Sequence, residues 1–380
     1  MTKRLLFLST VYPTPWEPHK GPANARLIGA MRRLGYSVSV IAPVPWVKWR
    51  PGNRLPRERG AEYPVFWYPP GIWRHRYHDW MRWSVGRAVE RAITSGPPVS
   101  AILAFWTHPD GTTAIDVGKR HGIPVGIIAG GSDVMLLAND PARRPIIGAT
   151  LRDAAHVFAI GSEIGRRVTE LGVSPSQVST YLRGVDLRHF SPGDRTEARR
   201  SLGLSTDAPL LLWVGNMVHV KAPERVIGVT RALEQSFPGI HLAMIGDGPM
   251  RQSLQRMALE SGALGERILF PGSLGESELA RWYRAANVFV LPSRSEGIPN
   301  VLVEAMASGL PFVASRVGGI PDLLPFGCSA AVPEGDLEAM TAAITTVLTA
   351  ADHRLPANGQ FDILAGARHV AHQLRLEAPE

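Results

Sequence analysis

Short apolar runs alternate with amphipathic stretches along almost the whole chain. In the first half these runs are residues 4–10, 37–43, 101–106, 124–130 and 156–161. In the second half they are residues 210–215, 241–246, 267–272, 287–293 and 311–315. Runs that stay apolar at successive positions are typical of strands buried on both faces, as in a parallel sheet. The pattern therefore predicts two parallel sheets, one in each half of the chain.

Stretches with helical periodicity separate these runs, for example residues 23–34, 73–94, 111–121, 222–236, 249–262, 276–285, 299–308 and 361–376. Strand–helix alternation predicts an α/β fold with two Rossmann-like domains whose sheets face each other across a cleft. Pro192, Gly193 and a polar cluster interrupt the pattern before the strand at Leu210. We therefore place an N-terminal domain at 1–192, joined by the helix 361–376, and a C-terminal domain at 193–360.

Composition restricts the class of protein. The chain has 380 residues, of which 45% are hydrophobic and 19% charged, and this suits a folded protein. Cys328 is the only cysteine, which excludes disulfide scaffolds and cysteine metal cages. No apolar run is long enough to span a bilayer, and the short run after Arg4 is interpreted as a strand and not as a signal peptide. We expect a cytoplasmic protein.

Positive charge and tryptophan are concentrated near the N-terminus. Residues 1–100 hold 16 Lys and Arg against 5 Asp and Glu, and six of the ten tryptophans lie between Trp46 and Trp83. No nucleic-acid-binding motif is found, so we expect no nucleic acid. The pattern favours peripheral contact with an anionic membrane surface at its inner face, or with a lipid-linked acceptor. An aromatic core helix with a solvated basic side, built on Trp73, Tyr77 and Trp80, explains the same residues.

One segment, residues 291–315, combines two carboxylates with a predicted helix start. Pro299 can open a helix at its first turn, and the backbone N–H groups of residues 297–300 then favour an anion beyond the strand end. Glu296 lies at the mouth of that site. Glu304 follows Gly297 by about two helical turns and could accept two hydrogen bonds from a ribose diol. A solvated loop glutamate and a helix-surface glutamate are the structural alternative.

The same segment resembles the signature of the retaining glycosyltransferases of family 4, which have the GT-B fold. EGIPNVLVEA and GLP in this segment, and VGGIPD at 317–322 just after it, follow that signature in order. Further stretches resemble the family at VGNMVHVKAPE (214–224), IGDGPM (245–250), FPGSLGESEL (270–279), LRGVDLRHFSP (182–192) and YPTPWEPHKGPANAR (12–26). The matched stretches occur in the family's order over most of the chain.

The resemblance implies a role for each matching residue. Lys221 would neutralise the donor diphosphate with help from Asn216, which replaces the commoner arginine. Glu296 would orient the donor sugar, and Glu304 would bind the ribose. The remaining donor-binding positions implied by the motifs are Gly21, Gly246, Gly248, Gly272, Gly297, Ile298, Pro299 and Asn300. Turn chemistry alone explains such glycines equally well.

Four positions in the first half bear on the mechanism. The family often has a histidine or arginine where this chain has Gly130, and an asparagine where it has Arg183. Asp133 could bond a sugar or acceptor hydroxyl, although a helix N-cap is the structural alternative. His108 is a weaker candidate, because an isolated histidine after a strand is more often structural.

The resemblance implies a nucleotide-sugar-dependent, hexosyltransferase-like enzyme of polysaccharide biosynthesis, with Glu296, Lys221 and Asp133 as catalytic residues. The donor would be a nucleotide sugar and the acceptor a sugar or a lipid-linked glycan. We expect no cofactor and no obligatory metal, because Lys221 and the helix start already neutralise the phosphates. A nucleotide-sugar epimerase, a phosphorylase-like enzyme and a non-catalytic nucleotide-sugar-binding module are the alternatives. A dehydrogenase is disfavoured, because no G-x-G-x-x-G follows the first strand.

Overall fold

The computed structural model describes residues 3–14, 17, 20–49, 60–326, 329–350, 355 and 359–376. The chain divides into two compact units. Unit 1 comprises Met1–Arg183 with Ile363–Glu380, and unit 2 comprises Gly184–Asp362. The division therefore falls earlier than residue 192, and it places the last helix with unit 1.

Unit 1 contains a seven-stranded sheet in which every pairing is parallel. The strand order is β4 (Ala61–Glu62), β2 (Ser37–Ile41), β1 (Arg4–Leu8), β6 (Val99–Phe105), β7 (Val125–Ala129), β8 (His156–Ala159) and β9 (Val178–Thr180). A small sheet pairs β3 (Val44–Pro45) with β5 (Val65–Phe66). All residues of β1 and β7 are buried, as expected for central strands covered on both faces.

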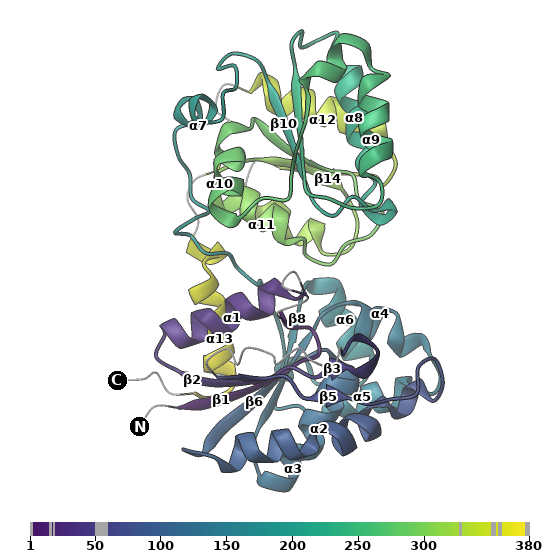
Figure 1. Ribbon diagram of the computed structural model, residues 1–380, viewed down its shortest axis with the longest axis vertical. Coiled ribbons are helices and arrows are strands. Elements are labelled where there is room, and N and C mark those ends of the chain that lie inside the picture. The colour runs from purple at the N-terminus through teal and green to yellow at the C-terminus, as the bar shows by residue number, and fades with distance from the viewer. Residues whose placement is uncertain are drawn as a thin grey trace. The chain divides into compact units, whose positions relative to one another are not determined.

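Helices cover both faces of the unit 1 sheet. α1 packs against α13 on one face, and α2 and α5 pack against α3 on the other (Figure 1). The bounds in unit 1 are α1 (Pro22–Arg33), α2 (Tyr77–Thr94), α3 (Thr112–His121), α4 (Ser132–Met135), α5 (Arg144–Arg152), α6 (Ser162–Glu170) and α13 (Ile363–Gln373).

Unit 2 contains a six-stranded parallel sheet. The order is β12 (Ile268–Gly272), β11 (His241–Ile245), β10 (Leu210–Val214), β13 (Val288–Leu291), β14 (Phe312–Ser315) and β15 (Ala330–Val332). Numbered within the unit, this is the order 3-2-1-4-5-6 of the doubly wound Rossmann fold. In that order β10 and β13 are neighbours. In doubly wound sheets ligands generally bind outside the carboxyl ends of the strands, at the point where the strand order reverses.

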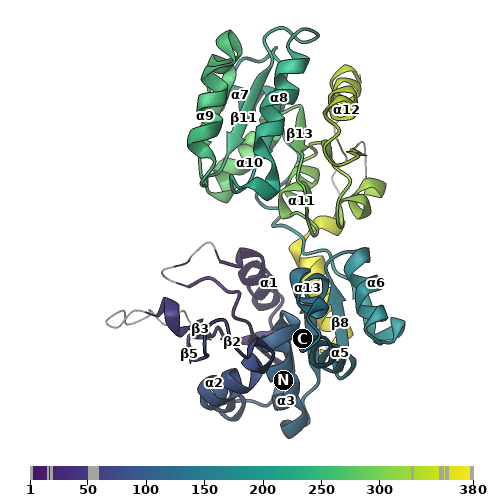
Figure 2. The same cartoon turned by 90° about the vertical axis from the view of Figure 1, so that its right-hand side faces the viewer.

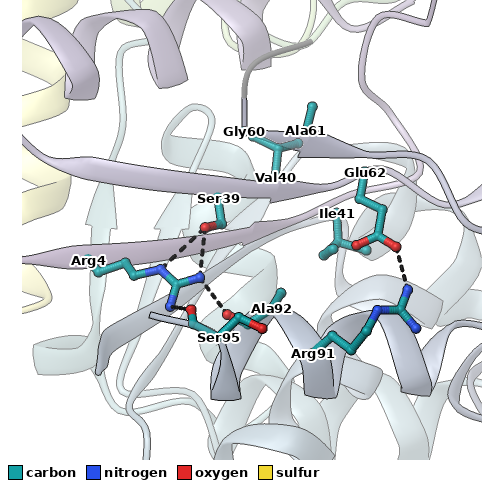
Figure 3. Close-up of a pocket in the computed structure, with 10 residues that line it drawn as sticks. All are labelled: Arg4, Ser39, Val40, Ile41, Gly60, Ala61, Glu62, Arg91, Ala92 and Ser95. Carbon is teal, nitrogen blue, oxygen red and sulfur yellow. Dashed lines mark hydrogen bonds and ion pairs between the residues drawn. The ribbon is translucent and has the colours of Figure 1, made fainter. Parts of the chain in front are cut away.

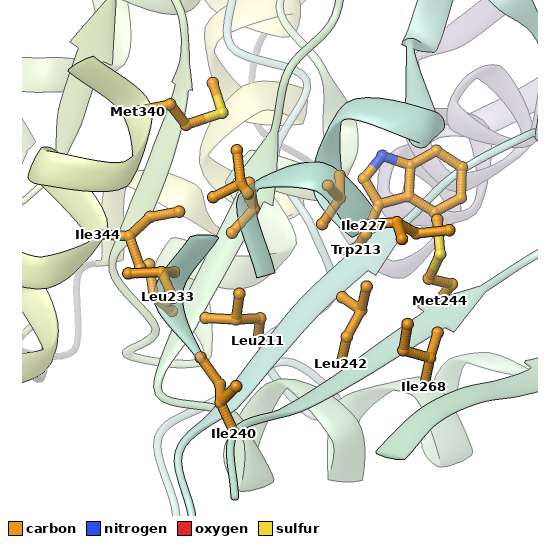
Figure 4. Packing of buried hydrophobic residues seen from close by; sticks show 14 of the residues in the cluster. Leu211, Trp213, Ile227, Leu233, Ile240, Leu242, Met244, Ile268, Met340 and Ile344 are labelled. Atoms are coloured by element: carbon orange, nitrogen blue, oxygen red, sulfur yellow. The ribbon is translucent and has the colours of Figure 1, made fainter. Parts of the chain in front are cut away.

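The core of unit 2 lies between its sheet and one layer of helices. α8 packs against α9 and α12 on this face, and α10 packs against α7 and α11 on the other (Figure 1, Figure 2). Figure 4 shows Trp213, Leu242 and Met244 of the sheet packed with Ile227 of α8 and Ile344 of α12. The bounds are α7 (Arg195–Ser201), α8 (Pro223–Leu233), α9 (Arg251–Leu259), α10 (Glu276–Ala285), α11 (Asn300–Ala307) and α12 (Leu337–Thr349).

The predicted pair of Rossmann-like domains with parallel sheets is confirmed, with three differences in detail. Both sheets contain more strands than the hydrophobic runs indicated, because β4, β9 and β15 are only two or three residues long. The stretch predicted as one helix over 73–94 is a helix only from Tyr77, after a short 3-10 turn at Arg74–Arg76. The polar cluster after Pro192 contains α7.

Candidate functional site

The carboxyl edge of the unit 2 sheet brings Lys221 and Glu296 together. Lys221 Nζ lies 2.7 Å from both carboxylate oxygens of Glu296, although the two residues are far apart in sequence. The Glu296 side chain is only 6% exposed, whereas that of Lys221 is 27% exposed. The predicted diphosphate-binding cation and the predicted sugar-orienting carboxylate therefore form one ion pair.

Two loops hold this pair in place. Lys221 lies in the loop after β10, and Glu296 lies in the loop after β13. The Arg294 N–H donates to the Val220 carbonyl over 2.9 Å, which joins the two loops directly. Ser293 Oγ donates to Glu296 Oε1 over 2.6 Å. The carboxylate thus has one neutral and one cationic donor, and its orientation is fixed.

The loop that carries Glu296 packs against the segment 317–319. Gly318 has a φ of 54°, and a Cβ atom there would lie 1.8 Å from the Glu296 carbonyl oxygen. Only glycine fits so close an approach at this backbone angle. The Gly319 N–H also donates to the Gly297 carbonyl over 3.1 Å. The VGG motif therefore supports the backbone of the E-G motif.

The predicted helix start follows directly. Ile298 and Pro299 are buried, and α11 begins at Asn300 with Pro299 as its N-cap. Within the described part of the chain, no residue accepts a hydrogen bond from the N–H of Gly297 or of Ile298. These N–H groups next to a helix N-terminus can hold a phosphate oxygen.

Glu304 lies on α11 as the spacing predicts, and it is buried. The Tyr283 hydroxyl of α10 donates to Glu304 Oε2 over 3.0 Å, and Tyr283 is completely buried. This hydrogen bond fixes the rotamer of the carboxylate. A ribose contact by Glu304 stays a prediction.

The glycine motif after β11 lies against the loop after β10. Gly246 has a φ of 125°, and a Cβ atom there would lie 2.0 Å from the Gly215 carbonyl oxygen. Gly248 lies against the Asn216 amide in the same way, since a Cβ atom at Gly248 would be 2.6 Å from Asn216 Oδ1. The Gly246 N–H donates to the Gly272 carbonyl over 2.8 Å. Gly246, Gly248, Gly272 and Asn216 therefore share one edge of the unit 2 sheet.

Arg251 is a cation at this edge that the motifs did not indicate. Its guanidinium donates to the carbonyls of Gly246 and Phe270 over 3.4 and 3.3 Å, and it lies 3.6 Å from the Asp247 carboxylate. Because Arg251 follows the G-x-G-P turn at the first position of α9, its place could have been inferred from the turn.

Unit 1 carries the other predicted residues. Gly21 caps α1 with a φ of 61° and packs against the Val11 carbonyl, at the end of β1. Asp133 is completely buried and accepts hydrogen bonds from four donor groups: Thr107 N–H and Oγ1 at 3.0 Å, Gly130 N–H at 3.1 Å and Gly131 N–H at 2.8 Å. This carboxylate ties the loops after β6 and β7 together, and its catalytic role stays a prediction.

Two further titratable groups of unit 1 are buried in the loop after β6. Burial raises the pKa of Asp110 to about 7, although Thr10 donates to it through its N–H and its hydroxyl. Burial and the neighbouring His78 lower the pKa of His108 to about 3. His108 is 2% exposed and lies 3.2 Å from His78 Nδ1, so its environment is that of a structural histidine.

A pocket of about 610 Å³ beside β2 and α2 has a structural explanation (Figure 3). Arg4, at the amino end of β1, donates to the carbonyls of Ala92, Ser95 and Pro97 over 2.6, 2.6 and 2.9 Å. These carbonyls lie at and beyond the end of α2, where a cation is favourable. Part of the positive surplus of the N-terminal region therefore serves the fold.

The described residues show no group of three or more His, Cys, Asp or Glu side chains arranged to hold a metal ion. None of the helices in the described part of the chain is both long and apolar enough to cross a membrane.

Two family models match the chain, one in each unit. The model described as "Glycosyl transferase 4-like domain" matches residues 21–181. The model described as "Glycosyl transferases group 1" matches residues 208–350. These stretches contain most of the predicted site residues of both units.

Individual proteins resemble the chain to different extents. D-inositol 3-phosphate glycosyltransferase 2 of Catenulispora acidiphila is 35% identical over 216 residues, which cover 54% of this chain and 50% of that protein. The chain spans about half the length of the first curated relatives it matches. A Bacillus subtilis glycosyltransferase named for teichuronic acid biosynthesis, TuaC, is 24% identical over 394 residues, which cover 97% of each chain.

The fold also matches solved structures. HepE of Anabaena in complex with UDP has a TM-score of 0.73 and 15% identity, with 99% of this chain and 100% of that chain covered. At this identity the similarity shows the fold alone, and it confirms the predicted GT-B architecture.

Proposed function

The chain belongs to the group 1 glycosyl transferases, and on that premise we propose that it moves a sugar from a nucleotide-sugar donor to an acceptor, with retention of anomeric configuration. The observation that carries the proposal is the ion pair of Lys221 and Glu296, set 2.7 Å apart at the carboxyl edge of unit 2. Ligands bind at this edge in doubly wound sheets.

The donor diphosphate would replace Glu296 as the partner of Lys221. As the bond between the sugar and the diphosphate breaks, negative charge builds on the phosphate oxygens. Lys221 and the N–H groups of Gly297 and Ile298 supply positive potential there, and Asn216 can donate a further hydrogen bond. The partly exposed Lys221 can turn toward the phosphates, while Ser293 keeps Glu296 oriented toward the sugar hydroxyls.

Thermal-shift measurements against a panel of nucleotide sugars test the donor proposal. A donor that binds only the folded state raises its melting temperature. UDP and UDP-glucose come first, because HepE is known in complex with each of them. Lys221→Met should abolish most of the shift. Lys119→Met, which removes an exposed lysine of α3 in unit 1, should leave it unchanged. Equal shifts in wild type and Lys221→Met would contradict the assignment.

Products formed with and without an acceptor separate transfer from epimerisation. An epimerase converts the nucleotide sugar when no acceptor is present, whereas a transferase releases nucleoside diphosphate and needs the acceptor for full turnover. If the donor binds but no nucleoside diphosphate is released and no nucleotide sugar is converted with any of a wide panel of acceptors, the non-catalytic binding module is favoured.

We further propose that unit 1 meets an anionic membrane surface from the cytoplasmic side. Six large hydrophobic side chains of unit 1 are between 40% and 72% exposed and are here called the hydrophobic patch: Val47, Trp49, Trp67, Ile72, Trp73 and Trp83. Trp67 stacks on Trp46 with 5.3 Å between ring centroids, and the backbone N–H of Trp67 donates to Ser84 Oγ, next to Trp83 in sequence. Basic side chains lie close to these residues in sequence at Lys48, Arg76 and Arg82, where they pair with Glu17, Asp79 and Asp116. Tryptophan and basic residues favour a membrane interface.

Vesicle co-sedimentation tests this second proposal. Binding to vesicles with anionic lipid at low salt should exceed binding to neutral vesicles, and it should fade as salt is raised, because each basic residue near the surface contributes about 1 kcal/mol. Replacing Trp73 and Trp83 by serine should weaken the binding at low salt. Equal and negligible binding to both vesicle types would leave a water-soluble acceptor as the better proposal.

A further inference from the structure

Arg183 crosses the carboxyl edge of the unit 1 sheet. It follows β9, yet its guanidinium carbon lies 4.8 Å from the ring centroid of Phe105, the last residue of β6. In the sheet order, β7 and β8 separate these two strands. The side chain therefore lies over the strand ends, where parallel sheets bind ligands.

The charge of Arg183 is not neutralised locally. Among the described residues, its guanidinium makes no hydrogen bond and no ion pair, and its contact is the face of Phe105. Burial and the neighbouring Arg26 lower its pKa to about 10. Asp133 is the carboxylate that opposes this effect, but its oxygens are occupied by Thr107, Gly130 and Gly131.

Gly130 and Arg183, the two positions of unit 1 that depart from the family pattern, both lie against the Phe105 ring. A Cβ atom at Gly130 would lie 2.8 Å from Phe105 Cζ and 2.9 Å from Trp106 Nε1, so a side chain at this position has no room. Arg183 brings a cation to the same Phe105 ring from the end of β9. The positive charge that the family often places at the position of Gly130 is supplied here by Arg183, which follows β9.

A helix start adds to the positive potential. Arg26 lies in α1, which has 12 residues and begins at the carboxyl edge of β1, where Asn24 Nδ2 donates to the Val11 carbonyl over 2.7 Å. The N-terminal end of a helix carries partial positive charge. β1 and β6 are neighbouring strands, so the start of α1 and the Phe105 ring that carries Arg183 lie at one edge of the unit 1 sheet, and the charge of Arg26 acts on Arg183.

We propose that Arg26 and Arg183 bind a phosphate group of the acceptor. The site would take a phosphate ester or a diphosphate, since guanidinium groups bind phosphate oxygens in pairs. That the bound phosphate belongs to the acceptor rests on the proposed glycosyl transfer. The anion site itself can be tested without turnover.

The test titrates inorganic phosphate into protein that is saturated with UDP, followed by ³¹P NMR. Arg183→Asn restores the residue usual in the family, and Arg26→Gln removes the second cation. Each should weaken phosphate binding at least about tenfold, the scale for loss of a charged hydrogen bond. Arg183→Lys should retain part of the affinity. Arg87→Gln, an exposed position of α2 in the same unit, should bind as wild type does. Circular dichroism spectra like that of the wild type must accompany each value.

Three results would overturn the proposal. One is absence of phosphate binding to the wild type, and another is equal binding by Arg183→Asn and wild type. The third is loss of UDP affinity in Arg183→Asn with phosphate binding intact, because the arginine would then serve the donor. If UDP itself does not bind, the donor proposal fails separately. The phosphate titration is then repeated without UDP in a Lys221→Met background.

Transfer assays distinguish the two sources of the phosphate. The soluble arm compares D-inositol 3-phosphate with inositol, and the lipid arm compares a polyprenyl-diphosphate-linked sugar with the octyl glycoside of the same sugar. Arg183→Asn should raise KM for the phosphorylated member of one pair at least about tenfold, with little change for its uncharged partner. Equal effects on both members of each pair would contradict phosphate recognition.

Discussion

The two units share a strand order and differ in how their carboxyl edges are built. Unit 2 has the order 3-2-1-4-5-6, and unit 1 repeats it with one further strand. At the edge of unit 2, glycines with positive φ let backbones touch, and the ionic groups form pairs such as Lys221–Glu296. At the edge of unit 1, a buried carboxylate, Asp133, is saturated by four donor groups, while the cation Arg183 has only an aromatic partner among the described residues.

The edge of unit 2 is built mainly from backbone N–H groups and close glycine contacts. The edge of unit 1 is built mainly from side chains that extend over the strand ends. A site made of backbone N–H groups and close glycine contacts tolerates few residue types, so its motif is visible in the sequence. A site made of side chains that reach over a sheet edge can place the same charge from several strands. We therefore expect mutations in unit 2 to affect the donor and turnover, and those in unit 1 to affect stability and the acceptor.

The largest effect is expected for Glu296→Gln. The change removes the negative charge that pairs with Lys221, although the amide oxygen can still accept from Ser293, so kcat should fall by about 10²–10³, the scale for losing one preorganised contact. Steady-state kinetics at saturating donor measure this. Glu278→Gln, on the surface of α10, is the matched control and should keep its turnover. A Glu296→Gln enzyme with the kcat of the wild type would show that the active site lies elsewhere.

The next effect concerns donor affinity. Glu304→Ala should weaken nucleotide-sugar binding by about 1–3 kcal/mol, because charged hydrogen bonds to the ribose are lost. Tyr283→Phe should cause a smaller loss, since it frees the carboxylate rotamer without removing the carboxylate. Calorimetric titration measures both. Donor affinity that stays the same in Glu304→Ala would disprove the ribose assignment.

A comparable effect, on stability and not on the donor, is expected in unit 1. In the wild type, backbone N–H groups donate to the Asp133 carboxylate. Asp133→Asn points an amide NH₂ group at some of these donors, so the free energy of unfolding should fall by about 1–3 kcal/mol. Urea denaturation measures it, and donor titration of the folded variant serves as the control. A stable Asp133→Asn variant with much reduced turnover would instead support the predicted catalytic role.

The effect that is smallest per pH unit is a pH dependence of stability. Burial raises the pKa of Asp110 from 3.8 to about 7. Between pH 4 and pH 7 the Asp110 carboxyl is therefore protonated in the folded state and ionised in the unfolded state. Stability from this group is therefore greatest below about pH 4 and decreases as pH rises toward 7. Relative to wild type, Asp110→Asn should gain stability over this window by at most about 1.4 kcal/mol per pH unit. Urea denaturation at pH 4 to 8 measures the difference, and a constant difference would contradict the raised pKa.

The sequence by itself determined the fold class and predicted which residues of unit 2 gather at the carboxyl edge of its sheet. Buried strands such as β1 and β10 are continuous apolar runs, and the E-G-x-P-N motif must stand between a strand and a helix because Pro299 and the glycines allow little else. Periodicity did not reveal β9 or β15, because strands of three residues are defined by their neighbours and not by their own pattern.

Only the tertiary structure decided which charges meet. The pairing of Lys221 with Glu296 depends on β10 and β13 being neighbours, and the contact of Arg183 with Phe105 depends on a side chain reaching across two intervening strands. The burial of Asp133 with four donors likewise comes from loops after two different strands. Such contacts join residues far apart in sequence, and no local propensity encodes them, because their energy depends on distances that exist only after the sheet has formed.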